Sequence, residues 1–93
     1  MKNIYILPSF ERSLKKLTPI QKKLVAGSLE EFNAFLTSGR MSAGFGLKKI
    51  NHDKFEFRVD IKLRIIVKVE EGNYYLILAG NHDDIKRYLR RFR

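Results

Sequence analysis

The stretch FEFRVDIKLRIIVKVEEGNYYLILAGNHDDIKRY, residues 55–88, decides the fold because two runs of alternating residues are followed by an apolar run and a basic end. Residues 55–60 and 63–70 alternate between apolar and polar side chains, a period of two that is typical of half-buried strands. The short segment 60–62 suits a tight antiparallel connection. Gly72 and Asn73 mark a second hairpin turn, because both residue types tolerate positive φ. The stretch therefore predicts a strand meander.

The third strand, residues 74–79, is apolar on both faces, which favours an interior position in the sheet. Residues 80–82 form its exit, and Asp83 with Asp84 favours the start of a last helix, where carboxylates satisfy backbone N–H groups and the helix dipole. If the apolar side chains of the first two strands face the core, four charged ones share the opposite face: Glu56, Arg58, Arg64 and Lys68. We take this face as the candidate site.

Two further strands are expected upstream of the meander. Residues 3–7 (NIYIL) form a short apolar run that Pro8 ends, because proline removes a backbone donor. Residues 40–46 contain two glycines and no periodicity, which predicts a loop. Residues 47–50 then add a short edge strand beside the meander. The chain thus predicts two short strands before the meander.

Two helices are expected between these strands. Ser9 can cap the first helix, whose apolar stripe has helical spacing: Phe10, Leu14 and Leu17. Thr18, Pro19 and Gln21 predict the start of the second, because threonine and glutamine form a capping box and proline fits the first position. Its stripe comprises Val25, Leu29, Phe32 and Leu36. Gly39 is a plausible stop, and the two helices should form a hairpin packed on the sheet.

Length and composition narrow the class of protein. A chain of 93 residues predicts a single domain, 1–93, with one modest core. The hydrophobic content of 44% favours a folded globule over disorder. The absence of cysteine excludes disulfides and a thiol nucleophile. The first ten residues lack a signal-like apolar run, and no stretch is long enough to span a membrane, so we expect a cytoplasmic protein.

The net charge is the strongest global signal. A formal charge of +9 and a pI near 10.0 indicate a polyanionic partner, either a nucleic acid or an acidic protein. The charge is uneven, because residues 19–39 sum to zero whereas residues 40–93 hold thirteen cations against seven anions. Residues 40–93 therefore carry most of the excess, and we expect the cations that would bind a nucleic acid such as RNA among them: Lys48, Lys49, Lys54, Lys68, Arg87, Arg90 and Arg91.

Metal, cofactor and covalent sites find little support in the sequence. His52 and His82 lie far apart, there is no cysteine, and neither Walker nor Rossmann glycines occur, so we expect neither a metal nor a cofactor. The serines lie outside any recognisable nucleophile motif. His52 is expected in a surface turn. The candidate chemistry must then come from the cations, carboxylates and aromatic residues of the meander and last helix.

The order of these elements resembles the RelE/ParE superfamily of bacterial toxin-antitoxin toxins. The likeness covers nearly the whole chain and includes four segments: LKKIN at 47–51, FEFRV at 55–59, LRIIVKV at 63–69 and ILAGNHDDIKRY at 77–88. It implies an α+β fold, with an N-terminal strand, a helical hairpin on a mainly antiparallel twisted sheet and a short basic C-terminal helix. It also implies an acidic antitoxin partner. RelE-like members cleave mRNA in the ribosomal A site, whereas ParE-like members poison DNA gyrase, and a non-toxic antitoxin-binding remnant is a third reading.

For a RelE-like member, the resemblance implies metal-free attack of a ribose 2′-hydroxyl on the adjacent phosphate. Arg64 matches the position of the family's phosphate-binding arginine, and Arg58 stands where a second cation is frequent. Glu56 is a possible general base, since a carboxylate among cations stays ionised. His82 lies near the family's arginine or histidine and could act as general acid. Tyr88 matches the C-terminal tyrosine, which could stack on a base or position the attacking hydroxyl.

Each of these roles has a structural alternative. The strand cations are equally compatible with a solvated face. Glu56 fits an ion pair with Arg58 or Lys54 better than the role of a base. His82 could simply fix the turn before the helix. Tyr88, three residues after an isoleucine, is equally suited to packing the helix on the sheet.

Overall fold

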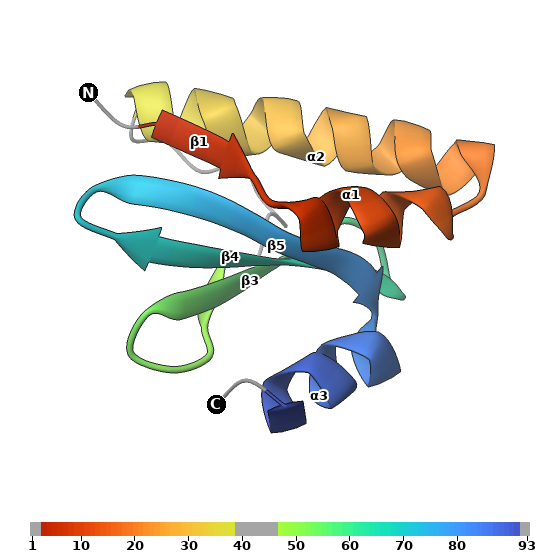
Figure 1. Ribbon diagram of the computed structural model, residues 1–93. Helices are drawn as coiled ribbons and strands as arrows, with labels where there is room; N and C mark the ends of the chain where they lie inside the picture. Colours follow the sequence, from red (N-terminus) through yellow and green to blue (C-terminus); the bar gives the residue numbers. More distant parts are fainter. Residues whose placement is uncertain (1–2, 39–46, 92–93) are drawn as a thin grey trace.

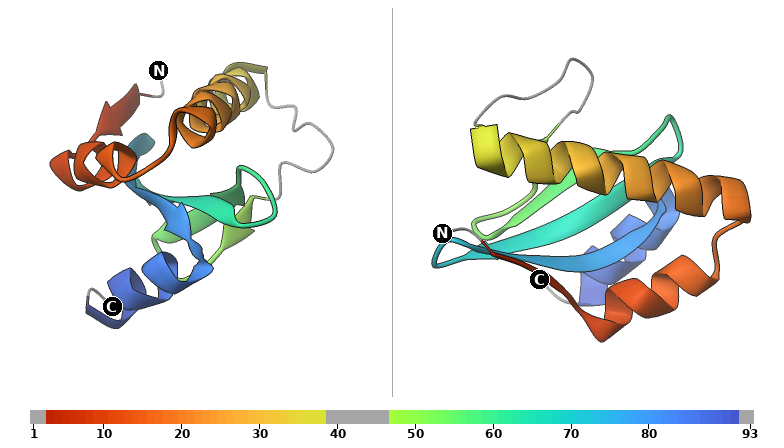
Figure 2. Two further views of the ribbon diagram at one scale, coloured as in Figure 1. Left: turned by 90° about the vertical axis from the view of Figure 1, so that its right-hand side faces the viewer. Right: turned by 90° about the horizontal axis from the view of Figure 1, so that it is seen from above.

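The computed structural model describes residues 3–38 and 47–91. Its five strands form one sheet in the order β1-β5-β4-β3-β2. Helices α1 and α2 lie over one face of this sheet and α3 lies over the other (Figures 1 and 2). The elements are β1 (Asn3–Ile6), α1 (Pro8–Lys15), α2 (Pro19–Ser38), β2 (Lys48–Lys49), β3 (Lys54–Arg58), β4 (Leu63–Glu70), β5 (Asn73–Asn81) and α3 (His82–Arg91).

The predicted α+β architecture is confirmed. Strand β1 pairs with β5 in parallel, while β2, β3, β4 and β5 pair with their neighbours in antiparallel fashion. Strand β5 therefore lies inside the sheet, as its two apolar faces predicted, and β2 forms the expected edge strand. The predicted loop at 40–46 and the helix stop at Gly39 lie outside the described residues.

The hairpin between β3 and β4 is closed by one carboxylate. Asp60 Oδ1 accepts the backbone N–H groups of Lys62 (2.9 Å) and Leu63 (2.7 Å). The N–H groups of Val59 and Asp60 in turn bind the Leu63 carbonyl. These bonds belong to the turn, so β3 ends at Arg58, two residues before the predicted boundary at 60.

The hairpin between β4 and β5 lies one residue earlier than predicted. Its positive-φ residues are Glu71 (φ 53°) and Gly72 (φ 79°), whereas Asn73 already pairs with Glu70 as the first residue of β5. A two-residue hairpin turn of this kind needs positive φ at both central positions, and here glutamate takes the first of them. The interpretation of Gly72 and Asn73 as the turn was therefore wrong by one position.

Strand β5 contains an irregularity that places two consecutive residues on the face toward α3. Ile66 pairs with Leu78 and Val67 pairs with Leu76, so Ile77 is an extra residue with no partner in β4. Both Ile77 and Leu78 pack in the cluster that contains Ile66. The bulge therefore enlarges the apolar surface available to α3.

Helix α1 occupies the edge of β5 where β1 ends. The Ser9 hydroxyl donates to the Ile77 carbonyl (2.6 Å), and the Ala79 N–H donates to Ser13 Oγ (3.0 Å). The prediction that Ser9 caps the helix was wrong, because α1 begins at Pro8 with Leu7 at the N-cap and no side-chain cap bond. Two serines, four residues apart, instead satisfy a sheet edge that has no strand beside it.

Capping boxes start both of the other helices. Thr18 and Gln21 exchange the predicted pair of bonds, from the Thr18 N–H to Gln21 Oε1 (2.9 Å) and from the Gln21 N–H to Thr18 Oγ1 (3.1 Å). At α3 the Asp84 N–H donates to Asn81 Oδ1 (2.9 Å) and the Asn81 N–H donates to Asp84 Oδ2 (3.0 Å). The cap of α3 is therefore Asn81, one turn before the carboxylate that the sequence indicated.

The sheet is buried on both faces by separate apolar clusters. On the side of α1 and α2, Phe32 stacks on Phe57 with ring centroids 5.0 Å apart and meets Tyr74 edge-on at 5.6 Å. On the opposite side, Ile66 and Ile77 are buried against Ile85 of α3. The second cluster is the one that holds α3, and with it the candidate site, on the sheet.

The close approach of α3 to the sheet gives a test at Gly80. A Cβ atom at this position would lie 2.8 Å from both Cβ and Oδ2 of Asp84. We expect Gly80→Ala to lower the free energy of unfolding by about 1–3 kcal/mol, because α3 or its cap must move. Urea unfolding measures this change.

Gly27 provides a matched control within α2. A Cβ there would meet no heavy atom within 4 Å, so Gly27→Ala should raise the free energy of unfolding by about 1 kcal/mol through helix propensity alone. If Gly80→Ala were as stabilising as Gly27→Ala, the tight packing of α3 against Gly80 would be refuted.

Candidate functional site

The face of the sheet beneath α3 carries the charged residues that the strand alternation grouped together. We call this set the basic face: Lys54, Glu56, Arg58, Arg64 and Lys68. Across β3 and β4, Lys54 pairs with Lys68 and Arg58 pairs with Arg64, so the paired side chains leave the sheet on the same side. Their common face is therefore as predicted.

The two lysines of β2 leave the sheet on opposite sides. Lys48 pairs with Glu56 and therefore lies at the margin of the basic face. Lys49 pairs with Phe55, which packs against the core on the side of α1 and α2. Both lysines of β2 were expected to bind RNA, but of these two Lys48 alone lies beside the basic face.

Glu56 pairs with Arg64, not with Arg58 or Lys54 as expected. The Arg64 Nη1 and Glu56 Oε1 atoms are 3.3 Å apart, and the side chains are only 24% and 12% exposed. Arg64 Nε is buried and has no hydrogen-bond partner among the described residues. Arg58 is exposed and forms no ion pair within residues 3–38 and 47–91. The basic face thus holds one guanidinium that is paired and partly desolvated and one that is open to an incoming anion.

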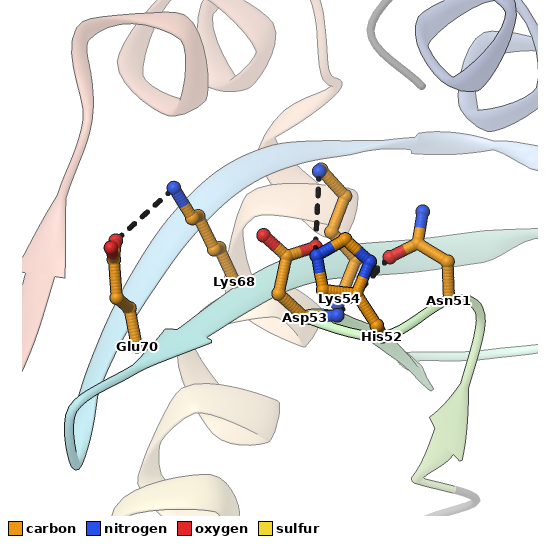
Figure 3. A network of polar contacts seen from close by, with 6 residues as sticks. All are labelled: Asn51, His52, Asp53, Lys54, Lys68 and Glu70. Carbon is orange, nitrogen blue, oxygen red and sulfur yellow. Dashed lines mark hydrogen bonds and ion pairs between the residues drawn. The ribbon is translucent and has the colours of Figure 1, made fainter.

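Lys54 is held by a residue that the sequence reasoning had not selected. Its Nζ lies 3.3 Å from Asp53 Oδ1, and the Lys54 side chain is 12% exposed (Figure 3). Burial alone would raise the pKa of Asp53, but the hydrogen bond from Lys54 and the charges of Lys54, His52 and Lys68 lower it below its ordinary value. Asp53 therefore stays ionised, and its negative charge balances the positive charge of Lys54, which the sequence predicted to bind RNA.

The turn before β3 explains how Asp53 reaches this position. Asn51 Oδ1 accepts the backbone N–H groups of Asp53 (3.4 Å) and Lys54 (3.1 Å), and the Asp53 carbonyl accepts the Val69 N–H at 2.8 Å. Asparagine followed two residues later by aspartate is a local turn signal that was available in the sequence. His52 between them is exposed, as predicted.

Lys68 reaches the same side of the sheet as Lys54 (Figure 3). Its Nζ lies 3.2 Å from Glu70 Oε2. The hydrogen bond and charge of Glu70 raise the pKa of Lys68 above its ordinary value, and the charge of Asp53 acts in the same direction. Lys68 therefore remains cationic, and each of the two lysines has a carboxylate beside it.

Tyr88 approaches the basic face from α3. It packs at the margin of the cluster formed by Ile66, Ile77 and Ile85. Burial raises the pKa of Tyr88 above its ordinary value of 10.0, while the charge of Lys68 lowers it and that of Asp53 raises it. The phenol is therefore protonated at neutral pH and suits a hydrogen-bond donor better than a base. It also packs the helix on the sheet, so the two interpretations of Tyr88 are compatible.

His82 stands apart from the other predicted catalytic side chains. It is the first residue of α3 and is exposed. It lies two residues after Gly80, the strand partner of Arg64, so the backbone enters α3 beside Arg64. Within the described chain, no hydrogen bond or ion pair joins His82 to Arg64, Glu56 or Tyr88. The structure thus groups Arg58, Arg64, Glu56 and Tyr88 on one face, with His82 at the end of that face.

The basic residues of α3 differ in their surroundings. Arg87 Nη2 lies 2.6 Å from Asp84 Oδ1. Arg87 and Arg91 line a cavity between α1 and α3, whereas Arg90 is exposed outside it. For the residues that the structure describes, no helix is long and apolar enough to cross a membrane, and no cluster of three or more His, Cys, Asp or Glu side chains could hold a metal ion.

Comparison of this structure with solved structures identifies the fold. The chain matches RelE in the RelB-RelE antitoxin-toxin complex from Methanococcus jannaschii with a TM-score of 0.67 and 15% identity, over 90% of this chain and 96% of that chain. It matches YafQ of E. coli with a TM-score of 0.65 and 13% identity, over 91% and 98%. It matches the YoeB-YefM complex from Staphylococcus aureus with a TM-score of 0.63 and 16% identity, over 88% and 98%.

These likenesses confirm that the chain has a RelE-like fold over nearly its whole length. The sequence itself matches no protein-family model and no curated protein at a significant level. At identities of 13–16%, the likeness lies in the arrangement of the helices and strands. The roles of individual residues must therefore be argued from this chain's own geometry.

The shared environment of Tyr88 gives a second prediction. Because Asp53 raises and Lys68 lowers the pKa of Tyr88, Asp53→Asn should lower this pKa and Lys68→Gln should raise it. A pH titration of the Tyr88 ring carbon by NMR, with labelled tyrosine and Tyr88→Phe for assignment, measures both shifts. The same titration of Tyr5, an exposed residue of β1, serves as an internal control. Shifts of the same sign in both variants would refute the grouping of these three side chains.

Proposed function

We propose that the protein is the toxin of a toxin-antitoxin system and cleaves mRNA on the ribosome as a metal-independent endoribonuclease. The observation that carries this proposal is the assembly of Arg58, Arg64, Glu56 and Tyr88 on one face of a RelE-like sheet. Lys54 and Lys68 add two ammonium groups to the same face. RelE-family toxins include many endoribonucleases, and this set matches what their chemistry requires.

The reaction begins when the ribose 2′-hydroxyl loses a proton and attacks the adjacent phosphorus. A cyclic 2′,3′-phosphate forms and the 5′-oxygen leaves with a proton. Negative charge builds on the phosphate oxygens in between, so cations fixed beside them lower the barrier. Arg64 can bind two of these oxygens with its planar fork, and Arg58 can approach them from the next strand. Lys54 and Lys68 then hold the neighbouring phosphates.

Proton transfer is assigned to the remaining groups. Glu56 accepts the proton of the 2′-hydroxyl, since its carboxylate lies 3.3 Å from the Arg64 guanidinium that binds the phosphate. When the phosphate binds Arg64 in place of Glu56, the Glu56 carboxylate is released beside the reacting hydroxyl. His82, at the end of the face, donates the proton to the leaving 5′-oxygen. Tyr88 donates a hydrogen bond or stacks on a base, because its phenol stays protonated.

The partner is proposed to be an acidic antitoxin. The structures that this chain resembles include complexes of toxins with antitoxins, namely RelB-RelE, DinJ-YafQ and YoeB-YefM. A protein of net charge +9 gains affinity and association rate from an acidic partner. We place both proteins in the cytoplasm, where the ribosome and mRNA are.

Arg64 gives the direct test of cleavage. We expect Arg64→Ala to slow cleavage of ribosome-bound mRNA by about 10²–10³-fold, because a preorganised oxyanion donor is lost. Arg64→Lys should recover only part of this loss, since an ammonium cannot bind two oxygens in the plane of a fork. Primer extension on purified translating ribosomes measures the cleavage. The matched control is Arg12→Ala, which removes an exposed arginine of α1 on the other side of the sheet.

Other outcomes point to other functions. A ParE-like function would replace this proposal if three results were found together. The mRNA would stay intact in cells whose growth the protein arrests, gyrase-dependent DNA breaks would form, and Arg64→Ala would remain fully toxic. Harmless expression of a folded protein would leave only antitoxin binding. Urea unfolding of each variant separates loss of chemistry from loss of fold.

The partner gives a further prediction. When the protein is co-expressed with a small acidic protein encoded beside it, the two should copurify and growth arrest should be relieved. Because the attraction is electrostatic, their affinity should fall as salt concentration rises. Isothermal titration at two salt concentrations measures this dependence. A neighbouring protein without acidic character, or one that fails to bind, would contradict the proposed partnership.

A further inference from the structure

A cavity of about 570 Å³ lies between α1 and α3, next to the end of β5. We call it the α1–α3 pocket. The two helices flank the end of β5 from opposite faces of the sheet (Figure 1). Its lining includes four cationic side chains from separate parts of the chain: Lys16, Lys62, Arg87 and Arg91. The basic face and its proposed chemistry do not use Lys16 or Lys62.

The polar side chains of this pocket offer hydrogen-bond donors. Gln21 and Asn81 both line it, and the amide oxygen of each is already occupied by a helix cap. Their amide nitrogens form no hydrogen bond among the described residues and remain as donors. The single carboxylate of the lining, Asp84, already accepts from Arg87 and from the Asn81 N–H. The pocket therefore has excess positive charge and few free acceptors.

Such a lining suits a ligand that brings several negatively charged acceptor oxygens. Phosphate oxygens of a nucleic acid backbone meet this requirement, because they accept from lysine, arginine and amide groups alike. The pocket is also connected to the basic face through Tyr88. This side chain lines the pocket, and its pKa responds to Lys68 and Asp53 of the other site. A nucleic acid strand bound at the basic face can therefore continue past Tyr88 into the pocket.

We propose that the α1–α3 pocket binds the phosphate backbone of single-stranded RNA that flanks the segment held at the basic face. This proposal rests on the proposed function for the identity of the nucleic acid. The role of the pocket is to add affinity and fix the direction of the strand, whereas the basic face performs the chemistry. Lys16 and Lys62 are its most informative residues, because both are exposed and lie outside the catalytic set.

The test uses a fluorescently labelled, single-stranded RNA that is methylated at every 2′-hydroxyl and therefore cannot be cleaved. Fluorescence anisotropy gives its dissociation constant for the full chain over a range of salt concentrations. We expect the double variant Lys16→Ala/Lys62→Ala to bind roughly tenfold more weakly at low salt. The slope of log affinity against log salt should become shallower by about 1.4, since two phosphate contacts on a single strand are lost.

The matched control is Lys22→Ala/Lys23→Ala, which removes the same charge from exposed positions of α2 that do not line the pocket. It should leave the salt slope close to that of the parent chain. Lys16→Arg/Lys62→Arg keeps both charges and should retain binding. Urea unfolding confirms that each variant is folded. The proposal would be overturned if the pocket and control variants changed RNA binding equally. It would also be overturned if the pocket bound an acidic peptide while the Lys16→Ala/Lys62→Ala variant kept the RNA affinity of the parent chain.

The outcome is separable from the proposed function because the RNA probe reports binding and not cleavage. Suppose that Arg64→Ala and the parent chain were both inactive on mRNA, but the pocket variant lost RNA affinity as expected. The pocket proposal would then be supported and the proposed nuclease activity would be refuted. If cleavage depended on Arg64 while the pocket variant bound RNA like the control, the nuclease would stand and the pocket would fall.

Discussion

The contact of Ile85 with Ile66 and Ile77 is the interaction on which the site depends. It is the reason that a short, highly charged helix lies flat against the second face of the sheet. The bulge at Ile77 supplies the extra apolar surface, and Gly80 permits the backbone of β5 to turn closely into α3. Burial of three isoleucines is worth several kcal/mol, which offsets the repulsion expected among nearby cations.

The same contact arranges the charges around it. Along β4 the residues facing α3 are Arg64, Ile66 and Lys68, so the central one anchors the helix while the outer two flank it. Carboxylates are interleaved with the cations, because Glu56 pairs with Arg64 and Asp53 pairs with Lys54. This balance allows like charges to face each other across two strands. An anionic ligand would contact Arg58 directly and would reach Arg64 and Lys54 by replacing the carboxylates that hold them in place.

The basic face and the α1–α3 pocket are built in the same way. Both rely on cations that different elements bring together: β3 and β4 at the basic face, and the C-cap of α1, the β3–β4 turn and α3 at the pocket. Tyr88 contributes to both. A single helix, docked by one apolar contact, therefore contributes residues to both proposed anion sites, and any change that loosens α3 would disturb both together.

Much of the fold could be predicted because its signals are local. Alternation in 63–70 and the Thr18 capping box depend on residues close in sequence, and both were confirmed. The errors arose where a residue had several partners within reach. Ser9 binds the edge of β5 and not its own helix, because β1 ends there and leaves that edge open. Glu56 binds Arg64, while Asp53, which adjoins Lys54 in the chain, holds that lysine.

By itself, the sequence determined the strands, the helices and which charged side chains of β3 and β4 share a face, since periodicity assigns faces without knowledge of the partner. Only the tertiary structure decided which carboxylate each cation meets, that Asp53 belongs to the site, and that Lys16 and Lys62 join α3 at a pocket. The physical reason is the distance along the chain over which each interaction acts. Alternation and capping act over a few residues, whereas these pairings depend on how segments far apart in the chain pack together.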